Sequence, residues 1–327
     1  MDRIKKALIT GVTSQDGILL AKLLEEKNYQ VFGLTRSLGT RSTLLKRVAP
    51  KTQVIEVKGY GMQHIHEIIA AVRPAEIYNL AAISSVKKSF DFPKETKIAN
   101  FSNFVDLISS IEKNKLSSDV KIFQASSSEM FGNSSTSPQN EETELNGISP
   151  YAESKILAHK YSDKLRKSGL HISSGIMFNH ESEYRTAEFL SRKIVNFVAE
   201  YKEGQEKRLK LGNIEVTRDW GYAGDYVYGM WLSLQQEYSD NYVFSTGVPH
   251  TVLDFLKLAM CTREISKNPL ELISIDEELK RPIEKYASLG DFSKAKKSMG
   301  WEPKISFEQM IKIMVEYEIK NGNDVHQ

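Results

Sequence analysis

Short apolar runs alternate with helical segments through the first 125 residues, and this alternation limits the fold more than any other feature of the chain. The strand-like runs are residues 6–10, 30–34, 53–57, 76–80 and 121–125. Between them, apolar residues at helical spacing predict helices over residues 18–27, 64–72 and 101–113. Strands that alternate with helices form parallel sheets covered on both faces, because the crossovers are right-handed. We therefore predict an α/β fold with a doubly wound, Rossmann-type parallel sheet.

The alternation becomes less regular beyond about residue 177. Helical patterns cover residues 189–201, 225–236 and 251–257, with polar, glycine-containing stretches between them. This predicts a Rossmann domain over residues 1–176 and a smaller, irregular lobe over residues 177–327, with a chain that can cross between them. The segment 133–149 is polar and loop-like, and a loop of this length in a compact domain is usually functional or mobile.

The composition excludes several classes of protein. A net charge of +2 indicates neither a nucleic-acid surface nor a membrane surface. No apolar run approaches the roughly 18 residues that span a bilayer, and the N-terminal run is too short for a signal peptide, so we expect a cytoplasmic protein. The single cysteine, Cys261, excludes an internal disulfide, and we expect it to be buried. The seven histidines show no metal-ligand spacing, so no metal is predicted.

A glycine turn joins the first strand to the first helix. Gly11 would make the tight turn and Gly17 would let the helix pack closely on the strand, so that amides at the helix start could meet a pyrophosphate. Ser14 stands where a TGxxGxxG pattern has its middle glycine, and its side chain would crowd the phosphates. The order of strand, turn and helix favours a dinucleotide site, with a turn that has no ligand as the alternative.

The end of the second strand indicates which dinucleotide is bound. An acidic residue there would take the adenine ribose hydroxyls of NAD. Arg36 stands there instead, between two hydroxyl residues, and an arginine suits the extra phosphate of NADP. We therefore expect NADP, with a solvated surface role for Arg36 as the alternative.

Tyr151 and Lys155 are the clearest candidates for catalysis. If a helix begins near Pro150, the two side chains share one face, and a nearby ammonium lowers the pKa of a phenol from about 10. A tyrosine tuned in this way can exchange a proton with a sugar hydroxyl. This spacing also arises by chance. The pair, however, follows the strand at residues 121–125 and the run SSSE at residues 126–129, and ligands bind at such strand ends.

The motifs resemble those of the extended short-chain dehydrogenases/reductases and, within them, the GDP-mannose 4,6-dehydratase family. Segments that span almost the whole chain carry the resemblance, among them QASSSEMFG, SPYAESK, MFNHESEYR and LGNIEVTRDWGYAGDYVYGMW. FNHES and LGN…RDWG…DYV are far more specific than the glycine turn. The resemblance implies conversion of GDP-mannose to GDP-4-keto-6-deoxymannose by internal hydride transfer through bound NADP.

The resemblance also implies four catalytic roles. Tyr151 would take the proton of the sugar 4-hydroxyl, and Lys155 would hold the nicotinamide ribose. Ser127 would hydrogen-bond the 4-hydroxyl. Glu129 would remove the C5 proton before water leaves from C6, and it is the most informative residue because relatives that only reduce or epimerise do not need it. The polar segment 133–149 would cover the site.

Further residues are placed around the two ligands by the resemblance. Those at NADP are Gly11, Thr13, Ser14, Gln15, Asp16, Gly17, Arg36, Leu80, Ala81, Ala82, Tyr151 and Lys155. Those at the GDP-sugar, mainly on the C-terminal lobe, are Ser84, Ser128, Asn179, Glu181, Arg185, Lys193, Leu211, Gly212, Arg218, Arg281 and Glu284. We expect a packing or hydrogen-bonding role for His180 rather than a catalytic one.

Three departures from the family pattern fall at the cofactor. Ser14 replaces a glycine, residues 57–61 lack the Gly-Asp-Leu that would bind the adenine amine, and the usual arginine pair is reduced to Arg36-Ser37, with Arg41 further on. We expect weaker or altered NADP binding. In the family, the arginine-rich loop that corresponds to residues 35–47 also builds a tetramer, so we expect a homodimer or homotetramer.

Other activities stay open. Glu183-Tyr184 replaces a Pro-Arg pair, which could reshape the sugar pocket and admit a related substrate such as a GDP-manno-heptose. A nucleotide-sugar reductase or epimerase of the same family would instead consume added NADPH steadily. A non-catalytic sensor that binds a dinucleotide is a further alternative, although such a protein has no need to keep all four catalytic residues.

Overall fold

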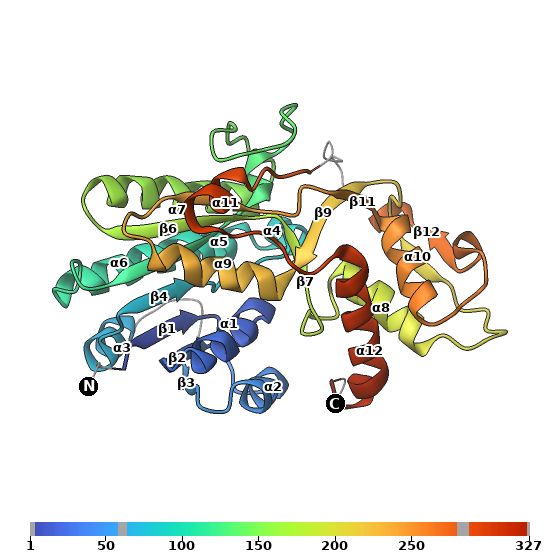
Figure 1. Ribbon diagram of the computed structural model, residues 1–327, viewed down its shortest axis with the longest axis horizontal. Coiled ribbons are helices and arrows are strands. Elements are labelled where there is room, and N and C mark those ends of the chain that lie inside the picture. The colour runs from blue at the N-terminus through green and yellow to red at the C-terminus, as the bar shows by residue number, and fades with distance from the viewer. Residues whose placement is uncertain (1–3, 58–63, 280–287, 326–327) are drawn as a thin grey trace.

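The computed structural model describes residues 4–57, 64–279 and 288–325. The centre of the described protein is a parallel sheet of seven strands in the order β10-β6-β5-β4-β1-β2-β3 (Figure 1). The strands are β1 (Lys6–Thr10), β2 (Gln30–Thr35), β3 (Gln53–Glu56), β4 (Glu76–Asn79), β5 (Lys121–Ser127), β6 (His171–Met177) and β10 (Asn241–Phe244). The strand order reverses between β1 and β4, which confirms the predicted doubly wound, Rossmann-type sheet.

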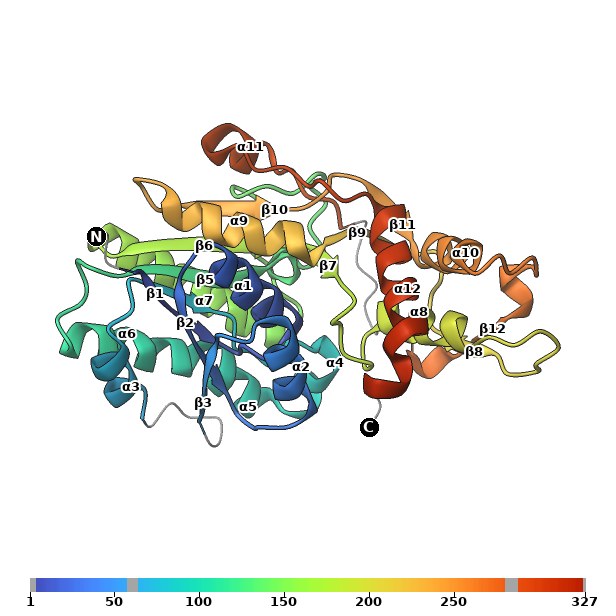
Figure 2. The ribbon, with the colours of Figure 1, turned by 60° about the horizontal axis from the view of Figure 1, so that its bottom comes forward.

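Helices cover both faces of this sheet (Figures 1 and 2). One face carries α1 (Gln15–Glu26) and α9 (Ala223–Gln235), and the other carries α3 (Ile65–Val72), α6 (Asn103–Lys113) and α7 (Pro150–Lys167). In β1, Ile9 packs into the first core and Leu8 into the second. Because alternate residues of a strand point to opposite faces, a strand buried on both sides needs a continuous apolar run, which is what the sequence shows.

A second lobe lies beyond the carboxyl ends of the strands, at the right of Figure 1. Its core is formed by α8 (Leu190–Glu200), α10 (Val252–Thr262) and α12 (Phe307–Val325). It also holds the sheet of β11 (Pro249–Thr251), β9 (Thr217–Tyr222) and β7 (Asn179–Glu181), and the pair β8 (Leu209–Leu211) and β12 (Ile273–Ile275). The chain crosses back between the lobes, since α9 and β10 join the large sheet.

Short helices complete the fold. They are α2 (Thr40–Val48), α4 (Val86–Asp91), α5 (Pro93–Lys97), the π-helical turn η1 (Ile98–Ser102), α11 (Ser293–Met299) and the 3₁₀ turns η2 (Ser128–Phe131), η3 (Pro269–Glu271) and η4 (Glu277–Leu279). None of the helices in the described ranges is both long and apolar enough to cross a membrane.

Two local expectations are wrong. The arginine-rich segment after β2 is not a loop over its whole length, because it forms helix α2, which buries Leu44 and Leu45 in the core. Cys261 is exposed rather than buried. Helix α10 turns Ala259 and Met260 towards the core, and the residue after them points outwards.

The polar segment 133–149 is held against its neighbours and does not cover the site as expected. The amide of Gln139 donates to the Leu289 carbonyl at 2.7 Å, and the Glu141 carboxylate accepts the Val243 amide at 2.7 Å. Within this segment only residues 148 and 149 line the pocket described below. The segment also contacts η2, where the Asn146 amide donates to the Met130 carbonyl at 2.8 Å.

A buried ion pair joins α8 to α12. Arg192 is 1% exposed, and its guanidinium bonds the carboxylate of Glu318, which is 4% exposed. The guanidinium also donates to the Glu183 carbonyl at 3.0 Å. A buried charge strongly destabilises the folded state when its partner is lost. This pair therefore holds the C-terminal helix against the rest of the lobe.

Replacing Glu318 by alanine should destabilise the protein by about 3–5 kcal/mol, because the charge of Arg192 then stays buried without a carboxylate. Glu316→Ala is the matched control, since it removes only an exposed pair with Lys312 on the same helix and should cost less than about 1 kcal/mol. Urea unfolding of the two variants measures both losses. Equal, small losses would contradict this account of the pair.

Candidate active site

A pocket of about 1070 Å³ lies between the carboxyl ends of the sheet strands and the second lobe. The ends of β1, β2, β4 and β5 form one wall, and β7, α8 and β9 form the other. Every predicted site residue within the described ranges lines this pocket except Gly17, while Arg281 and Glu284 lie outside those ranges. The fold therefore gathers residues that are far apart in the sequence into one cavity, although their individual roles stay predictions.

The turn between β1 and α1 requires its two glycines. Gly11 has a φ of +71°, and a Cβ added there would lie 2.9 Å from the Cα of Ala81. A Cβ on Gly17 would lie 2.5 Å from the carbonyl oxygen of Gly11. Only glycine fits both positions, because the backbones approach too closely for a side chain. The close approach brings the start of α1 to the pocket wall.

Ser14 caps α1. Its Oγ accepts the Gly17 amide at 3.0 Å. The first amides of a helix have no partner inside the helix, so this cap leaves those of Gln15 and Asp16 to an anion. Ser14 thus has a structural use that a glycine would lack, and its predicted effect on phosphate binding stays a prediction.

The wall at residues 80–82 is fixed by one buried hydroxyl. Thr10 Oγ1 accepts the amides of Leu80 and Ala81, both at 3.1 Å. The same hydroxyl donates to Asn79 Oδ1 at 2.8 Å. These bonds set the backbone after β4 directly beside the glycine turn, where a dinucleotide is expected.

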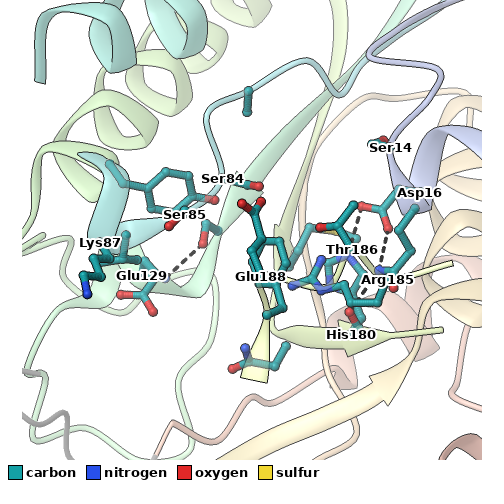
Figure 3. Close-up of a pocket in the computed structure, with 18 of the residues that line it drawn as sticks. Ser14, Asp16, Ser84, Ser85, Lys87, Glu129, His180, Arg185, Thr186 and Glu188 are labelled. Carbon is teal, nitrogen blue, oxygen red and sulfur yellow. Dashed lines mark hydrogen bonds and ion pairs between the residues drawn. The ribbon is translucent and has the colours of Figure 1, made fainter. Parts of the chain in front are cut away.

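Gln15 and Asp16 tie the start of α1 to β7. His180 Nε2 lies 2.9 Å from Asp16 Oδ2, and His180 Nδ1 donates to the Phe178 carbonyl at 2.7 Å (Figure 3). Gln15 donates to the His180 carbonyl at 3.1 Å and accepts the Ser182 hydroxyl at 3.0 Å. Burial alone would raise the pKa of Asp16, but the charge and hydrogen bond of His180 lower it. The same pairing raises the pKa of His180 in spite of burial, and it gives His180 the hydrogen-bonding role predicted for it.

Tyr151 lies in the first turn of α7, as predicted. Ser149 caps this helix by accepting the Ala152 amide at 3.1 Å. Burial raises the pKa of Tyr151 to about 12, and a hydrogen bond with Ser127 opposes this only in part. The expectation that Lys155 lowers this pKa is therefore wrong in this structure. The Lys155 Nζ lies 5.8 Å from the centre of the Tyr151 ring, and desolvation of the phenol dominates.

Lys155 is a nearly buried part of the pocket lining. It is 4% exposed, and its Nζ donates to the Ala125 carbonyl at 2.8 Å. Burial lowers the pKa of Lys155 to about 8, although the charge of Asp16 opposes the shift. The side chain can therefore change its charge near neutral pH, which is a useful property in a proton-transfer site.

Glu129 stands on η2, directly after β5. Its amide donates to Ser127 Oγ at 3.2 Å, so Ser127 contacts both the Glu129 backbone and Tyr151. Figure 3 shows Glu129 and Arg185 on different sides of the pocket. The half-buried Glu129 is thus a carboxylate in the same cavity as the Tyr151 phenol.

Arg185 is held at the opposite wall by two contacts. Its guanidinium carbon lies 3.6 Å from the centre of the Phe189 ring, and its Nε lies 2.9 Å from Glu181 Oε2. Glu181 is buried and also accepts the Ser191 hydroxyl at 2.7 Å. In this arrangement Glu181 orients Arg185, which gives the pocket a fixed cation suited to an anionic ligand.

Sequence reasoning missed charged residues on the pocket wall. Lys87 and Glu188 line it, and the position of Lys87 soon after β4 is the one signal that could have indicated either. Arg41, considered for the cofactor end and for assembly, lines the pocket and donates within the chain, to Thr13 O at 3.0 Å and Tyr184 O at 2.9 Å.

Glu183 and Tyr184 do not line the pocket, which contradicts a direct effect on the sugar site. The Tyr222 hydroxyl donates to Glu183 Oε2 at 3.2 Å. The Tyr184 ring meets Tyr317 of α12 edge-on, with 5.6 Å between the ring centres. These side chains point into the packing between α12 and the lobe, so they give no support to a GDP-manno-heptose substrate.

Comparison with known proteins identifies the family. The chain matches the family of GDP-mannose 4,6 dehydratases over residues 8–314. It is 39% identical to GDP-mannose 4,6 dehydratase 1 of Arabidopsis thaliana, covering 97% of this chain and 90% of that protein. It is 34% identical to the GDP-mannose 4,6 dehydratase of Homo sapiens, covering 96% of this chain and 91% of the human protein. The chain belongs to the GDP-mannose 4,6-dehydratase family.

Solved structures share the fold across the whole chain. The UDP-glucose 4-epimerase of Thermotoga maritima has a TM-score of 0.85 at 23% identity and covers 97% of this chain and 99% of its own. The dTDP-glucose 4,6-dehydratase of Bacillus anthracis, in complex with NAD, has a TM-score of 0.81 at 21% identity, covering 98% of each chain. RMD of Pseudomonas aeruginosa, complexed with NADPH, has a TM-score of 0.78 at 18% identity, covering 97% of this chain and 99% of its own.

Lys155→Met should stabilise the protein at pH 7 by about 1–2 kcal/mol. The pKa of Lys155 is about 8 in the folded protein, against about 10.4 in an unfolded chain, so the folded state carries an unfavourable charge at pH 7. Methionine removes that charge and loses one hydrogen bond. Between about pH 8 and pH 10 the unfolded wild-type chain binds more protons than the folded one, so wild-type stability rises and the gap closes.

Urea unfolding at several pH values from about 7 to 9.5 measures this difference. Lys160→Met, an exposed position on the same helix, serves as the control and should differ little from wild type at any pH. A Lys155→Met protein that is less stable than wild type at pH 7, or a gap that does not depend on pH, would contradict the burial argument.

Proposed function

We propose that the chain converts GDP-mannose to GDP-4-keto-6-deoxymannose and keeps NADP bound throughout. Its family supports the substrate and the reaction. The observation that carries the proposal is the position of Glu129, which shares one pocket with Ser127, Tyr151 and Lys155. Oxidation of a sugar hydroxyl needs only a tyrosine and a lysine, whereas loss of water from C6 also needs a base for the C5 proton.

The residues at the start of α1 fit a dinucleotide. The glycine turn places the start of α1 on the pocket wall, where a bound anion would meet backbone amides. When bound, an oxidised nicotinamide dinucleotide supplies the acceptor for the C4 hydride, the donor that returns it to C6, and a positive charge that favours the phenolate of Tyr151. The net reaction is then the loss of one water molecule.

The protein would handle the protons. Tyr151 takes the proton of the sugar 4-hydroxyl, and the hydrogen bond from Ser127 together with the charge of Arg185 favours its phenolate. The new C4 carbonyl acidifies the C5 hydrogen, which Glu129 removes. Hydroxide leaves C6 as water when a proton is delivered to it, and hydride addition at C6 with a proton at C5 completes the 6-deoxy product.

The cofactor preference is proposed to be for NADP. Solved relatives of the fold hold either NAD or NADPH, so the fold does not decide between them. Arg36 follows Thr35 at the end of β2, lines the pocket beside Ser37, and is a cation suited to the extra phosphate of NADP.

Arg36→Ala should lower the affinity for NADPH by about tenfold or more and change the affinity for NADH by less than about twofold, because only NADPH carries the phosphate. Cofactor fluorescence titrations measure both affinities. Arg47→Ala, on α2 outside the pocket lining, is the matched control and should alter neither. Equal losses for both cofactors would contradict a phosphate contact at Arg36.

We also propose a cytoplasmic homo-oligomer, either a dimer or a tetramer. Apolar side chains are exposed on neighbouring short helices and on α7, where Phe90 is 54% exposed and Ile98 and Leu157 are each 40% exposed. A second copy of the chain would bury this surface, since contiguous exposed apolar patches commonly mark protein interfaces.

Glu129→Gln should lower the dehydration rate with GDP-mannose by about 10²- to 10⁴-fold, because the amide cannot take the C5 proton. NMR of the reaction mixture, with no reductant added, measures the 4-keto-6-deoxy product. Glu153→Gln, an exposed position on α7, should retain wild-type activity. Full dehydration by Glu129→Gln would show that another group removes the C5 proton.

A further inference from the structure

Asp16 places a carboxylate in the first turn of α1, the helix start at which the pyrophosphate of the proposed cofactor would bind. Asp16 is in the first turn of α1, beside the amides that the Ser14 cap leaves to an anion. Asp16 also lines the pocket. A helix start favours one anion, but a second anion at short distance from the first is repelled. The carboxylate must therefore be neutralised before the pyrophosphate can use this helix start.

His180 is the titratable group in direct contact with that carboxylate, at 2.9 Å, and the neutral Gln15 side chain donates to its other oxygen at 3.1 Å. Three other titratable groups interact electrostatically with Asp16, namely Arg185, Lys155 and Tyr151. Arg185 forms its ion pair with Glu181, and Lys155 donates to the Ala125 carbonyl. The His180 ring also stacks on Tyr226, with 4.8 Å between ring centres, which holds the imidazole in place.

The hydrogen bonds of His180 favour its charged form. Nδ1 faces the Phe178 carbonyl, which can only accept, so Nδ1 carries a proton. A neutral ring would then present a lone pair to the Asp16 carboxylate, whereas the imidazolium presents a second N–H. The raised pKa of His180 and the lowered pKa of Asp16 agree with this geometry.

We propose that protonated His180 cancels the charge of Asp16 and thereby allows the start of α1 to accept the pyrophosphate of the dinucleotide. The inference rests on the proposed cofactor. His180 and Asp16 are positioning residues in this account, because they act on the cofactor through the local charge and through the link between α1 and β7.

The proposal makes cofactor affinity depend on pH. Asp16 stays ionised across the neutral range because its pKa is lowered, so the charge of the pair is set by His180. As the pH rises through the raised pKa of His180, the imidazole loses its charge. The negative charge of Asp16 is then no longer compensated, so it repels the pyrophosphate and the affinity for the cofactor falls. By linkage, bound cofactor raises the pKa of His180 further by the same factor.

Binding of ADP-ribose measured by calorimetry from about pH 6.5 to pH 9 tests this dependence. The probe has the pyrophosphate but lacks the extra phosphate, which would itself titrate near pH 6. Lys155 also titrates near pH 8, so all proteins carry Lys155→Met as a common background. In that background we expect the affinity for ADP-ribose to fall about tenfold from pH 6.5 to pH 9. A tenfold change corresponds to a shift of one unit in the pKa of His180 when ADP-ribose binds.

Charge-removing variants then separate charge compensation from direct contact. His180→Gln leaves Asp16 uncompensated and should bind about tenfold more weakly at pH 6.5, with no further fall towards pH 9. Asp16→Asn should bind as well as the background protein at pH 6.5 and more tightly at pH 9. The double variant should recover the affinity that His180→Gln loses, which a misfolded protein could not do.

Opposite outcomes would overturn the inference. If Asp16→Asn weakens binding equally at every pH and the double variant recovers nothing, Asp16 contacts the cofactor directly and charge compensation is wrong. If neither ADP-ribose nor NADPH binds the wild-type protein at any pH, the proposed function fails and the inference fails with it. NMR of His180 gives a second readout, in which its pKa should rise by about one unit when ADP-ribose binds.

Discussion

A chain of buried hydrogen bonds across the ends of three strands fixes the geometry on which the site depends. Thr10 of β1 donates to Asn79 of β4 at 2.8 Å, and Asn79 donates to Gln124 of β5 at 2.7 Å. Gln124 donates in turn to the Ala125 carbonyl at 3.1 Å, the same carbonyl that receives Lys155. Any slip of one strand would leave buried polar groups unsatisfied, so the glycine turn, the wall after β4 and the catalytic strand stay in register.

Burial then sets the protonation of Tyr151 and Lys155, which these hydrogen bonds help to position. It raises the pKa of Tyr151 and lowers that of Lys155, so both lean towards their neutral forms. Asp16 and His180 behave differently, because their mutual contact outweighs burial and keeps both charged. The pocket therefore holds a tyrosine and a lysine whose neutral forms are favoured by burial, beside the ion pair that we propose to compensate the charge of the cofactor. Both properties come from desolvation and contact geometry rather than from residue type alone.

Local sequence patterns predicted the features that depend on neighbouring residues. Strands β1 to β5 were predicted because each is a short apolar run, whereas β6 and β10 were not predicted. The role of Glu129 was implied by the family resemblance, and its place soon after β5 agreed with a site at that strand end. The contacts of Arg41 with Thr13 and Tyr184 were not predictable, since they join residues that only the tertiary fold brings together. The shift of the Tyr151 pKa was missed for a related reason, because spacing along a helix says nothing about how much solvent the fold removes.

The proposed function requires that the hydride lost from C4 of the sugar return to C6 of the same sugar, for which a bound nicotinamide dinucleotide would supply the acceptor and the donor. GDP-mannose that carries deuterium at C4 tests it directly, with the product read by NMR and mass spectrometry. The account predicts that the deuterium is kept and appears at C6, in a protein supplied with no added cofactor beyond one equivalent of NADP. Loss of the deuterium to solvent, or its accumulation in free reduced cofactor, would contradict the account.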